Sequence, residues 1–274
     1  MNSTATAQES DVEPASGFSA HVHRARILPT TIGHRILETL LPPTCLTCHQ
    51  RTDKVGTVCV RCWNSIRFIE KPFCEVLGTP FAYDLGEGAL SAEAIANPPP
   101  FERLRSIAHY DDTIRQLVLS LKFSDRTDLA PWMADWMVQW VKRSAPELLE
   151  NNPLIVPVPL HRRRLLSRRF NQSAELARPF ARLADCVYAP ELLERSRSTR
   201  QQVGLKQSER AANVRGAFRV PASRNIEVSH RRVLLIDDVY TTGATLEACA
   251  RALIRGGAAG VDCLTFARVA PEEG

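Results

Sequence analysis

From residue 101 onward, the hydrophobic pattern predicts helices that alternate with strands. The apolar positions of DDTIRQLVLSLKF (111–123) recur every three or four residues, which is typical of an amphipathic helix. DLAPWMADWMVQWVKRS (128–144) predicts a second helix, and the regular spacing of its tryptophans indicates core packing rather than a cofactor site. Two more helices are expected over 171–184 and 242–257.

Shorter apolar segments lie between these helices and predict strands. They are RSIAHYD (105–111), PLIVPVPL (153–160), RVLLIDD (232–238) and GVDCLTFARV (260–269). The later ones are continuous apolar runs, the pattern of parallel strands with helices on both faces. We therefore expect residues 101–274 to form an α/β domain with a parallel sheet.

The N-terminal part of the chain has a different pattern. Residues 1–28 are polar and predict a disordered lead-in. Residues 29–80 combine an amphipathic helix over 30–41 with a cysteine-rich module. The Gly- and Ala-rich segment 81–100 ends in three prolines and predicts a linker.

Composition limits the class of protein. The 274 residues are 44% hydrophobic and 24% charged, which is typical of a soluble globular protein. No apolar run approaches the roughly 18 residues of a membrane span, and the N-terminus lacks the pattern of a secretory signal. We therefore expect a cytoplasmic protein without membrane association, in which disulfides are unfavourable.

The charge pattern adds a candidate partner class. Net charge is +5, and arginines cluster in HRRRLLSRRF (161–170) and RSRSTR (195–200). Two such clusters favour a polyanionic partner, either a phosphate-rich small molecule or nucleic acid, over an ordinary solvated helix face.

The spacing of four cysteines predicts a metal site. CLTCHQRTDKVGTVCVRC carries two C-x2-C pairs, made of Cys45 with Cys48 and Cys59 with Cys62. Two such pairs complete a tetrahedron around Zn²⁺ and leave no open position, so the site is expected to be structural. Reduced structural cysteines or disulfides are the alternatives, and a cytoplasmic setting disfavours the disulfides.

The segment VLLIDDVYTTGAT (233–245) combines carboxylates, which repel anions, with a turn that attracts them. Asp237 and Asp238 follow the apolar run and can accept hydrogen bonds from sugar hydroxyls. The glycine–hydroxyl turn that follows opens a helix, and a helix N-terminus attracts phosphate. The alternative is an ordinary strand–turn–helix corner. The turn residues that would bind the phosphate are Thr241, Thr242, Gly243, Ala244 and Thr245.

This segment resembles the PRPP motif of type I phosphoribosyltransferases. Two further blocks, VPVPLHRRRLLSRRFNQSAELA (156–177) and RSRSTRQQVGLKQSERAANVRGAFRV (195–220), resemble the ComF family, also called ComF/GntX-like phosphoribosyltransferases. Members of this family pair such a domain with an N-terminal double zinc ribbon-like module. The resemblance implies a type I phosphoribosyltransferase fold, preceded here by a small zinc-binding module with four cysteine ligands.

The resemblance also implies roles for individual residues. Asp237 and Asp238 would hold the ribose hydroxyls, directly or through Mg²⁺, and the 241–245 turn would bind the 5′-phosphate. His161 and Arg162 match the place of the pyrophosphate loop. Arg197 begins the segment in which type I enzymes carry a flexible catalytic loop.

Cys74 is a fifth candidate zinc ligand. ComF-family members often carry a further C-x2-C-G here, but this chain has Leu77 before Gly78. That difference argues against a second complete site.

Two functions remain open at this point. The chain would transfer or recognise phosphoribosyl groups from PRPP with release of pyrophosphate, or it would handle nucleotides or single-stranded DNA in competence without turnover. Its partners would be PRPP or a related ribose phosphate, with single-stranded DNA and a homodimer left open.

Overall fold

The computed structural model describes residues 42–53, 56–123, 128–161, 170–197 and 214–270. All of these residues except Pro42 belong to the unit Pro43–Gly274. The expected lead-in and the helix over 30–41 lie outside the described residues.

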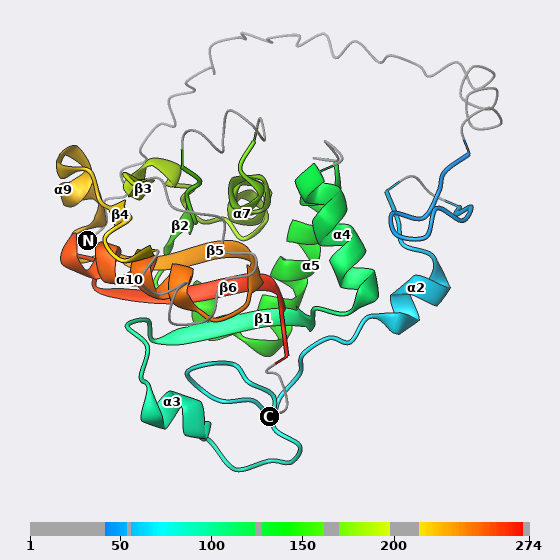
Figure 1. Ribbon diagram of the computed structural model, residues 1–274, viewed down its shortest axis with the longest axis horizontal. Coiled ribbons are helices and arrows are strands. Elements are labelled where there is room, and N and C mark those ends of the chain that lie inside the picture. The colour runs from blue at the N-terminus through cyan, green and yellow to red at the C-terminus, as the bar shows by residue number, and fades with distance from the viewer. Residues whose placement is uncertain (1–41, 54–55, 124–127, 162–169, 198–213, 271–274) are drawn as a thin grey trace, which may run out of the picture. The chain divides into compact units, whose positions relative to one another are not determined.

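A four-stranded parallel sheet lies at the centre of this unit (Figure 1). Its strand order is β1-β6-β5-β2. The bounds are β1 Arg103–His109, β2 Leu154–Pro157, β5 Arg232–Tyr240 and β6 Gly260–Arg268. The α/β fold expected from the hydrophobic pattern is confirmed.

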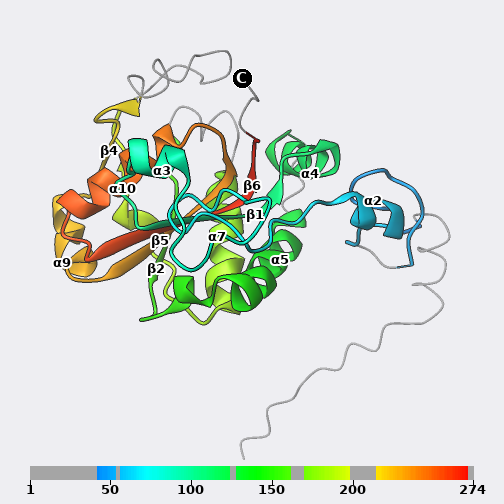
Figure 2. The ribbon, with the colours of Figure 1, turned by 90° about the horizontal axis from the view of Figure 1, so that it is seen from below.

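Helices cover both faces of the sheet (Figure 2). On one face lie α4 (Asp112–Phe123), α5 (Leu129–Ser144) and α7 (Gln172–Leu183). On the other lie α10 (Ala244–Arg255) and α3 (Ala92–Ala96). The expected helices over 111–123, 128–144, 171–184 and 242–257 are therefore present.

Strand β5 shows why its sequence is a continuous apolar run. Leu234 and Ile236 are buried among the helices of the α5 face, whereas Val233 and Leu235 are buried on the α10 face. Successive side chains of a strand point to opposite faces, so a sheet covered on both sides needs apolar residues at every position.

The tryptophans of α5 belong to the core, as predicted. Trp140 is buried, and Trp132 and Trp136 are partly buried against the same cluster. The indole N–H of Trp140 donates to the Ile69 carbonyl at 2.8 Å, which satisfies its polar group inside the core.

Several short elements complete the described fold, and the sequence pattern does not predict them. A two-stranded antiparallel sheet pairs β3 (Glu194–Arg195) with β4 (Phe218–Arg219). The remaining helices are α2 Val60–Ser65, α9 Asn225–Val228, η1 Pro146–Leu149, η2 Pro190–Leu192 and η3 Ala222–Arg224. Pieces of two to six residues carry too little hydrophobic periodicity to be recognised in a sequence.

The segment 81–100 differs from the expected linker. It contains α3, whose N-cap Ser91 accepts a hydrogen bond from the Ala94 N–H at 3.3 Å. Ala94 is buried, and the Glu75 N–H donates to the Ala89 carbonyl at 2.9 Å. The segment folds because it returns to the chain near residue 75, a contact that local composition does not reveal.

Candidate functional site

Two strand ends bring the candidate site together. β5 lies between β6 and β2, and it continues past the acids to Tyr240. Asp237 is in register with Thr265 of β6, and the Val158 N–H, just beyond β2, donates to the Ile236 carbonyl at 2.9 Å. The two acids therefore belong to the strand itself rather than to the turn after it, at the carboxyl edge where open α/β sheets bind ligands.

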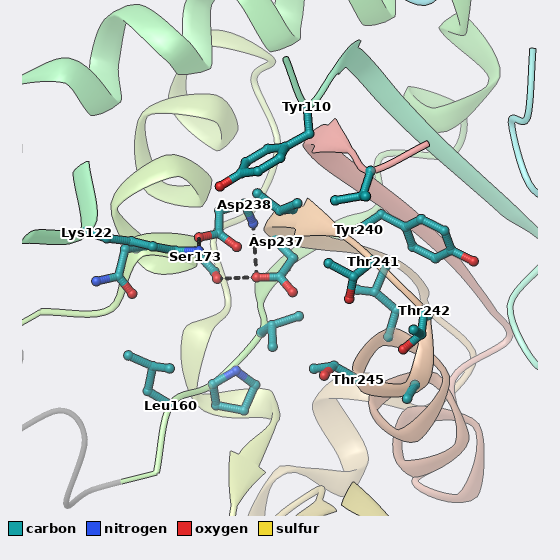
Figure 3. A pocket seen from close by; sticks show the side chains of 18 of the residues that line it. Tyr110, Lys122, Leu160, Ser173, Asp237, Asp238, Tyr240, Thr241, Thr242 and Thr245 are labelled. Atoms are coloured by element: carbon teal, nitrogen blue, oxygen red, sulfur yellow. Dashed lines mark hydrogen bonds and ion pairs between the residues drawn. The ribbon is translucent and has the colours of Figure 1, made fainter. Parts of the chain in front are cut away.

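A pocket of about 330 Å³ lies at this edge (Figure 3). The residues predicted as ribose and phosphate ligands all line it, namely Asp237, Asp238, Thr241, Thr242, Gly243, Ala244 and Thr245. Residues from the β1–α4 connection, α4, α7 and the loop after β2 complete the wall, among them Tyr110, Lys122, Leu160 and Ser173.

Asp237 is held in one orientation by two donors. Its Oδ1 accepts the Ser173 hydroxyl at 2.7 Å and the Asp238 backbone N–H at 3.0 Å. Burial and the negative charge of Asp238 raise the pKa of Asp237 to about 7, although both hydrogen bonds act in the opposite direction. This carboxyl therefore changes its protonation near neutral pH.

Asp238 forms an ion pair across the pocket wall. Its Oδ2 lies 2.6 Å from the Lys122 Nζ, and the two side chains are only 12% and 23% exposed. Burial alone would lower the pKa of Lys122, but the charge of Asp238 and their hydrogen bond raise it. The pocket thus holds a fixed cation beside the two acids.

Sequence reasoning missed both Lys122 and Ser173. Lys122 lies in the last turn of α4, next to the apolar face that predicted the helix. Ser173 lies in the first turn of α7, after the N-cap Asn171, whose amide nitrogen donates to the Val158 carbonyl at 3.0 Å. Ser173 falls inside the 156–177 block that carried the resemblance, whereas nothing in the local sequence marks Lys122.

The turn after β5 has the geometry of an anion site. Gly243 is the N-cap of α10 with φ of +79°, a conformation that L side chains rarely adopt. A Cβ there would also meet the Tyr240 ring at 3.1 Å. The hydroxyls of Thr242 and Thr245 lie beside the N-terminus of α10, where backbone N–H groups and the helix dipole favour phosphate (Figure 3).

The basic residues predicted for the site divide into three groups. His161 lines an adjoining pocket of about 360 Å³, together with Arg195 and Arg219. Arg195 lines both pockets, so the structure brings this arginine to the site. Arg197 is exposed, donates to the Arg215 carbonyl at 2.7 Å, and is not among the residues that line either pocket. Arg162 and the segment 198–213 lie outside the described residues.

The four predicted zinc ligands converge on one point. The sulfur atoms of Cys45, Cys48, Cys59 and Cys62 all lie within 4.8 Å of one another. A tetrahedral Zn²⁺ with bonds of about 2.3 Å places its sulfurs about 3.8 Å apart, and the Cys48 and Cys59 sulfurs are 3.6 Å apart. The donor set and its spacing fit a structural zinc ion.

Comparison with known proteins agrees with this two-part arrangement. A family model described as "Double zinc ribbon domain" matches residues 36–95, and one described as "Phosphoribosyl transferase domain" matches residues 171–273. The "DNA utilization protein YhgH" of Escherichia coli strain K12 is 32% identical over 212 residues, which are 77% of this chain and 90% of the relative.

The chain belongs to the ComF family.

Two further ComF-family relatives carry competence names. "Competence protein F" of Haemophilus influenzae is 28% identical over 214 residues, covering 77% of this chain and 90% of that protein. "Competence protein ComFC" of Bacillus subtilis is 26% identical over 214 residues, covering 77% and 84%. The similarity extends across both parts of the chain.

Solved structures resemble this ComF-family chain less closely. The glutamine PRPP amidotransferase of B. subtilis, complexed with ADP and GMP, aligns with a TM-score of 0.37 and 16% identity. The alignment covers 54% of this chain and 30% of that one, and a likeness this weak supports no functional comparison. Among the described helices, none combines the length and hydropathy that a membrane crossing requires.

Proposed function

We propose that this ComF-family chain binds PRPP or a closely related ribose phosphate in the pocket at the end of β5. The observation that carries the proposal is one cavity that contains both Asp237 and Asp238 and the N-terminus of α10. Carboxylates repel anions and a helix N-terminus attracts them, so the two groups suit different parts of one ligand. A ribose with a hydroxyl pair and a 5′-phosphate matches both.

The ribose diol would lie against the acids. Asp237 is oriented by Ser173 and by the Asp238 N–H, so little reorganisation is needed when a hydroxyl donates to it. Asp238 is already paired with Lys122, whose ammonium reduces the negative charge that a phosphorylated sugar would meet. Thr242 and Thr245 would donate to the 5′-phosphate.

The donor set also fits magnesium, because carboxylate oxygens are ligands of the type that Mg²⁺ prefers. Held by these carboxylates together with PRPP, Mg²⁺ would supply positive charge against the pyrophosphate leaving group. Arg195 lies where a second positive charge could act on the same group, because it lines both the ribose pocket and its neighbour.

The reaction would be phosphoribosyl transfer. A nitrogen nucleophile attacks C1 of PRPP, the bond from C1 to pyrophosphate breaks, and the electron pair leaves with the pyrophosphate. The chain's own contribution is to hold the ribose and the phosphate, with Asp237 accepting from a ribose hydroxyl in its ionised form.

Pyrophosphate release from PRPP and Mg²⁺, screened with nucleobases and amines as acceptors, tests turnover, and calorimetry tests binding. Asp237→Asn should weaken PRPP binding at least about tenfold, the scale of a hydrogen bond to a charged group. Glu150→Gln, a charge change at an exposed position outside the pocket, is the matched control. Unchanged affinity in Asp237→Asn would refute the pocket assignment.

The names of the relatives favour a second candidate function. "DNA utilization protein" and "competence protein" point to a role in handling DNA, in which the domain would bind a nucleotide or single strand without turnover. Each phosphate contact with a single strand would then give a salt slope of roughly −0.7 in log affinity. Fluorescence anisotropy with a labelled oligonucleotide, titrated with salt and then with PRPP, separates the candidates. Tight DNA binding that ignores millimolar PRPP would favour the DNA role.

A further inference from the structure

The two halves of the cysteine-rich module, residues 44–62 and 73–94, repeat one backbone pattern. Each half begins with an antiparallel bridge, between Thr44 and Arg51 in the first half and between Phe73 and Pro80 in the second. In both halves a cysteine follows the first bridge residue, and the residue four positions after that cysteine has φ of +59°. These residues are His49 after Cys45 and Gly78 after Cys74.

Hydrogen bonds inside the two turns are the same. The Cys45 N–H donates to the Gln50 carbonyl at 2.7 Å, and the Cys74 N–H donates to the Thr79 carbonyl at 2.8 Å. The His49 N–H donates to the Cys45 carbonyl at 3.1 Å, and the Gly78 N–H donates to the Cys74 carbonyl at 2.8 Å. The two turns are therefore structural copies, although their sequences differ.

The sulfur contacts fix the correspondence between the second arms of the two halves. The Cys45 sulfur accepts the Cys59 N–H at 3.2 Å, and the Cys74 sulfur accepts the Ser91 N–H at 3.2 Å. Cys59 is the N-cap of α2 and Ser91 is the N-cap of α3, so each sulfur meets the start of a helix. Ser91 thus occupies the place of Cys59.

This correspondence assigns four equivalent positions in the second half. The ligand positions 45, 48, 59 and 62 of the first half match Cys74, Leu77, Ser91 and Ala94. Leu77 and Ala94 offer no ligand atom, and the Ser91 hydroxyl accepts the Ala94 N–H at 3.3 Å. One thiol is left where a structural zinc site takes four ligands. The second zinc that a double ribbon implies does not fit these residues.

Apolar packing fills the place of that second zinc. Cys74 is fully buried, Leu77 and Ala94 are buried at 4% and 5% exposure, and all three pack in one cluster with Phe101 and Leu104. The Cys74 sulfur also accepts the Leu77 N–H at 3.4 Å. This hydrogen bond helps to fix the turn conformation that a bound metal would otherwise fix. Burial of these side chains supplies free energy that needs no ligand.

The second half is also attached to the central sheet. The Leu104 N–H of β1 donates to the Val76 carbonyl at 2.7 Å. The buried guanidinium of Arg105 donates to the Glu75 carbonyl at 2.8 Å, and that of Arg268 donates to the Leu77 carbonyl at 2.8 Å. Three consecutive carbonyls of this half are therefore held by β1 and β6.

We propose that the chain is a double ribbon with one zinc, in which residues 73–96 fold without metal and stay attached to the sheet. Only residues 43–66 depend on the ion. The module therefore has one metal-sensitive half and one half whose stability is set by the phosphoribosyltransferase domain.

Metal analysis of the full-length chain, purified under reducing conditions, gives the first test. We expect one zinc per chain, and the same value for Cys74→Ala, whereas Cys45→Ser should lose the zinc. Two zinc ions in the unmodified chain, or loss of zinc in Cys74→Ala, would overturn the proposal.

Hydrogen exchange with and without a strong chelator tests the separate behaviour of the halves. Chelation should abolish protection in peptides from 43–66 and leave 73–96 unchanged, because metal binding is coupled to folding only where ligands exist. Equal loss of protection in both halves would overturn the proposal. Leu77→Cys, Ser91→Cys and Ala94→Cys together should raise the zinc content to two per chain, and a folded triple variant that still holds one would contradict the assigned positions.

Discussion

The Lys122 ammonium lies 2.6 Å from the Asp238 carboxylate, at the edge of the sheet where the ribose phosphate is proposed to bind. The pair joins the end of α4 to the end of β5, two elements separated by most of the domain sequence. The ion pair therefore connects two elements that both line the pocket. Removal of either charge should affect both the stability of the chain and ligand binding.

Lys122→Met should lower the free energy of unfolding by about 1–3 kcal/mol, because Asp238 loses its partner in a mostly buried setting. Urea denaturation measures the effect, and Lys142→Met, a change at an exposed position of α5, is the control. Adding Asp238→Asn to Lys122→Met should recover part of the loss. Additive losses in the double variant would show that the two side chains do not interact.

PRPP affinity should rise as pH increases through about 7, because Asp237 accepts a hydroxyl hydrogen bond only when ionised and its pKa is raised to about 7. Below that pH, the ionised fraction of Asp237 falls about tenfold for each pH unit. Calorimetry across pH 5.5–8.5 (roughly one unit and a half to either side of the midpoint) follows the change. Asp237→Asn should remove this part of the pH dependence.

Ser173→Ala should shift the same midpoint to higher pH. The Ser173 hydroxyl lowers the pKa of Asp237, so its removal leaves burial and the charge of Asp238 less opposed. Ser223→Ala, at an exposed position of η3, serves as the control. A midpoint that moves to lower pH would contradict the assigned hydrogen bond.

Thr242→Val and Thr245→Val should each weaken binding of PRPP about tenfold, which corresponds to about 1.4 kcal/mol for a lost hydrogen bond to a phosphate. The affinity for ribose without a phosphate should not change in these variants. The comparison of PRPP with ribose therefore distinguishes a phosphate contact from a general distortion of the turn.

Gly78→Ala should destabilise the chain by more than about 2 kcal/mol, and Gly86→Ala by only about 1 kcal/mol. Both glycines have positive φ, of +59° and +88°. A Cβ on Gly78 would lie 2.4 Å from the Leu104 carbonyl oxygen, whereas a Cβ on Gly86 would meet nothing within 4 Å. Thermal unfolding of the two variants separates the two effects. Gly86→Ala reports backbone strain alone, and Gly78→Ala adds the steric clash with β1.

The sequence predicts the sheet and the glycine–threonine turn before α10 because both are encoded locally. The apolar run of β5 and the residues that follow it, from Asp237 to Thr245, occupy one short segment. Periodicity and turn chemistry over such a segment are visible without any knowledge of the fold.

Features that depend on contacts between distant segments are not predictable in this way. Lys122 is separated from Asp238, and Ser173 from Asp237, by long stretches that include several elements. The ordered segment 81–100 has the composition of a linker. Its defining contact, from the Ser91 N–H to the Cys74 sulfur, is not visible in sequence because nothing marks Ser91 as a partner of Cys74. The sequence predicts the zinc site and, through Leu77, the loss of a second one, but the apolar packing that replaces the second site is visible only in the structure.

The buried guanidiniums of Arg105 and Arg268 have a practical consequence for truncation. A fragment cut at residue 101, the start of the α/β pattern, would remove the carbonyls of Glu75 and Leu77 to which these arginines donate. It would also uncover the face of Leu104 and leave two buried cations without these acceptors. The shortest piece that retains the sheet therefore begins before residue 73, inside what its sequence presents as a separate metal-binding module.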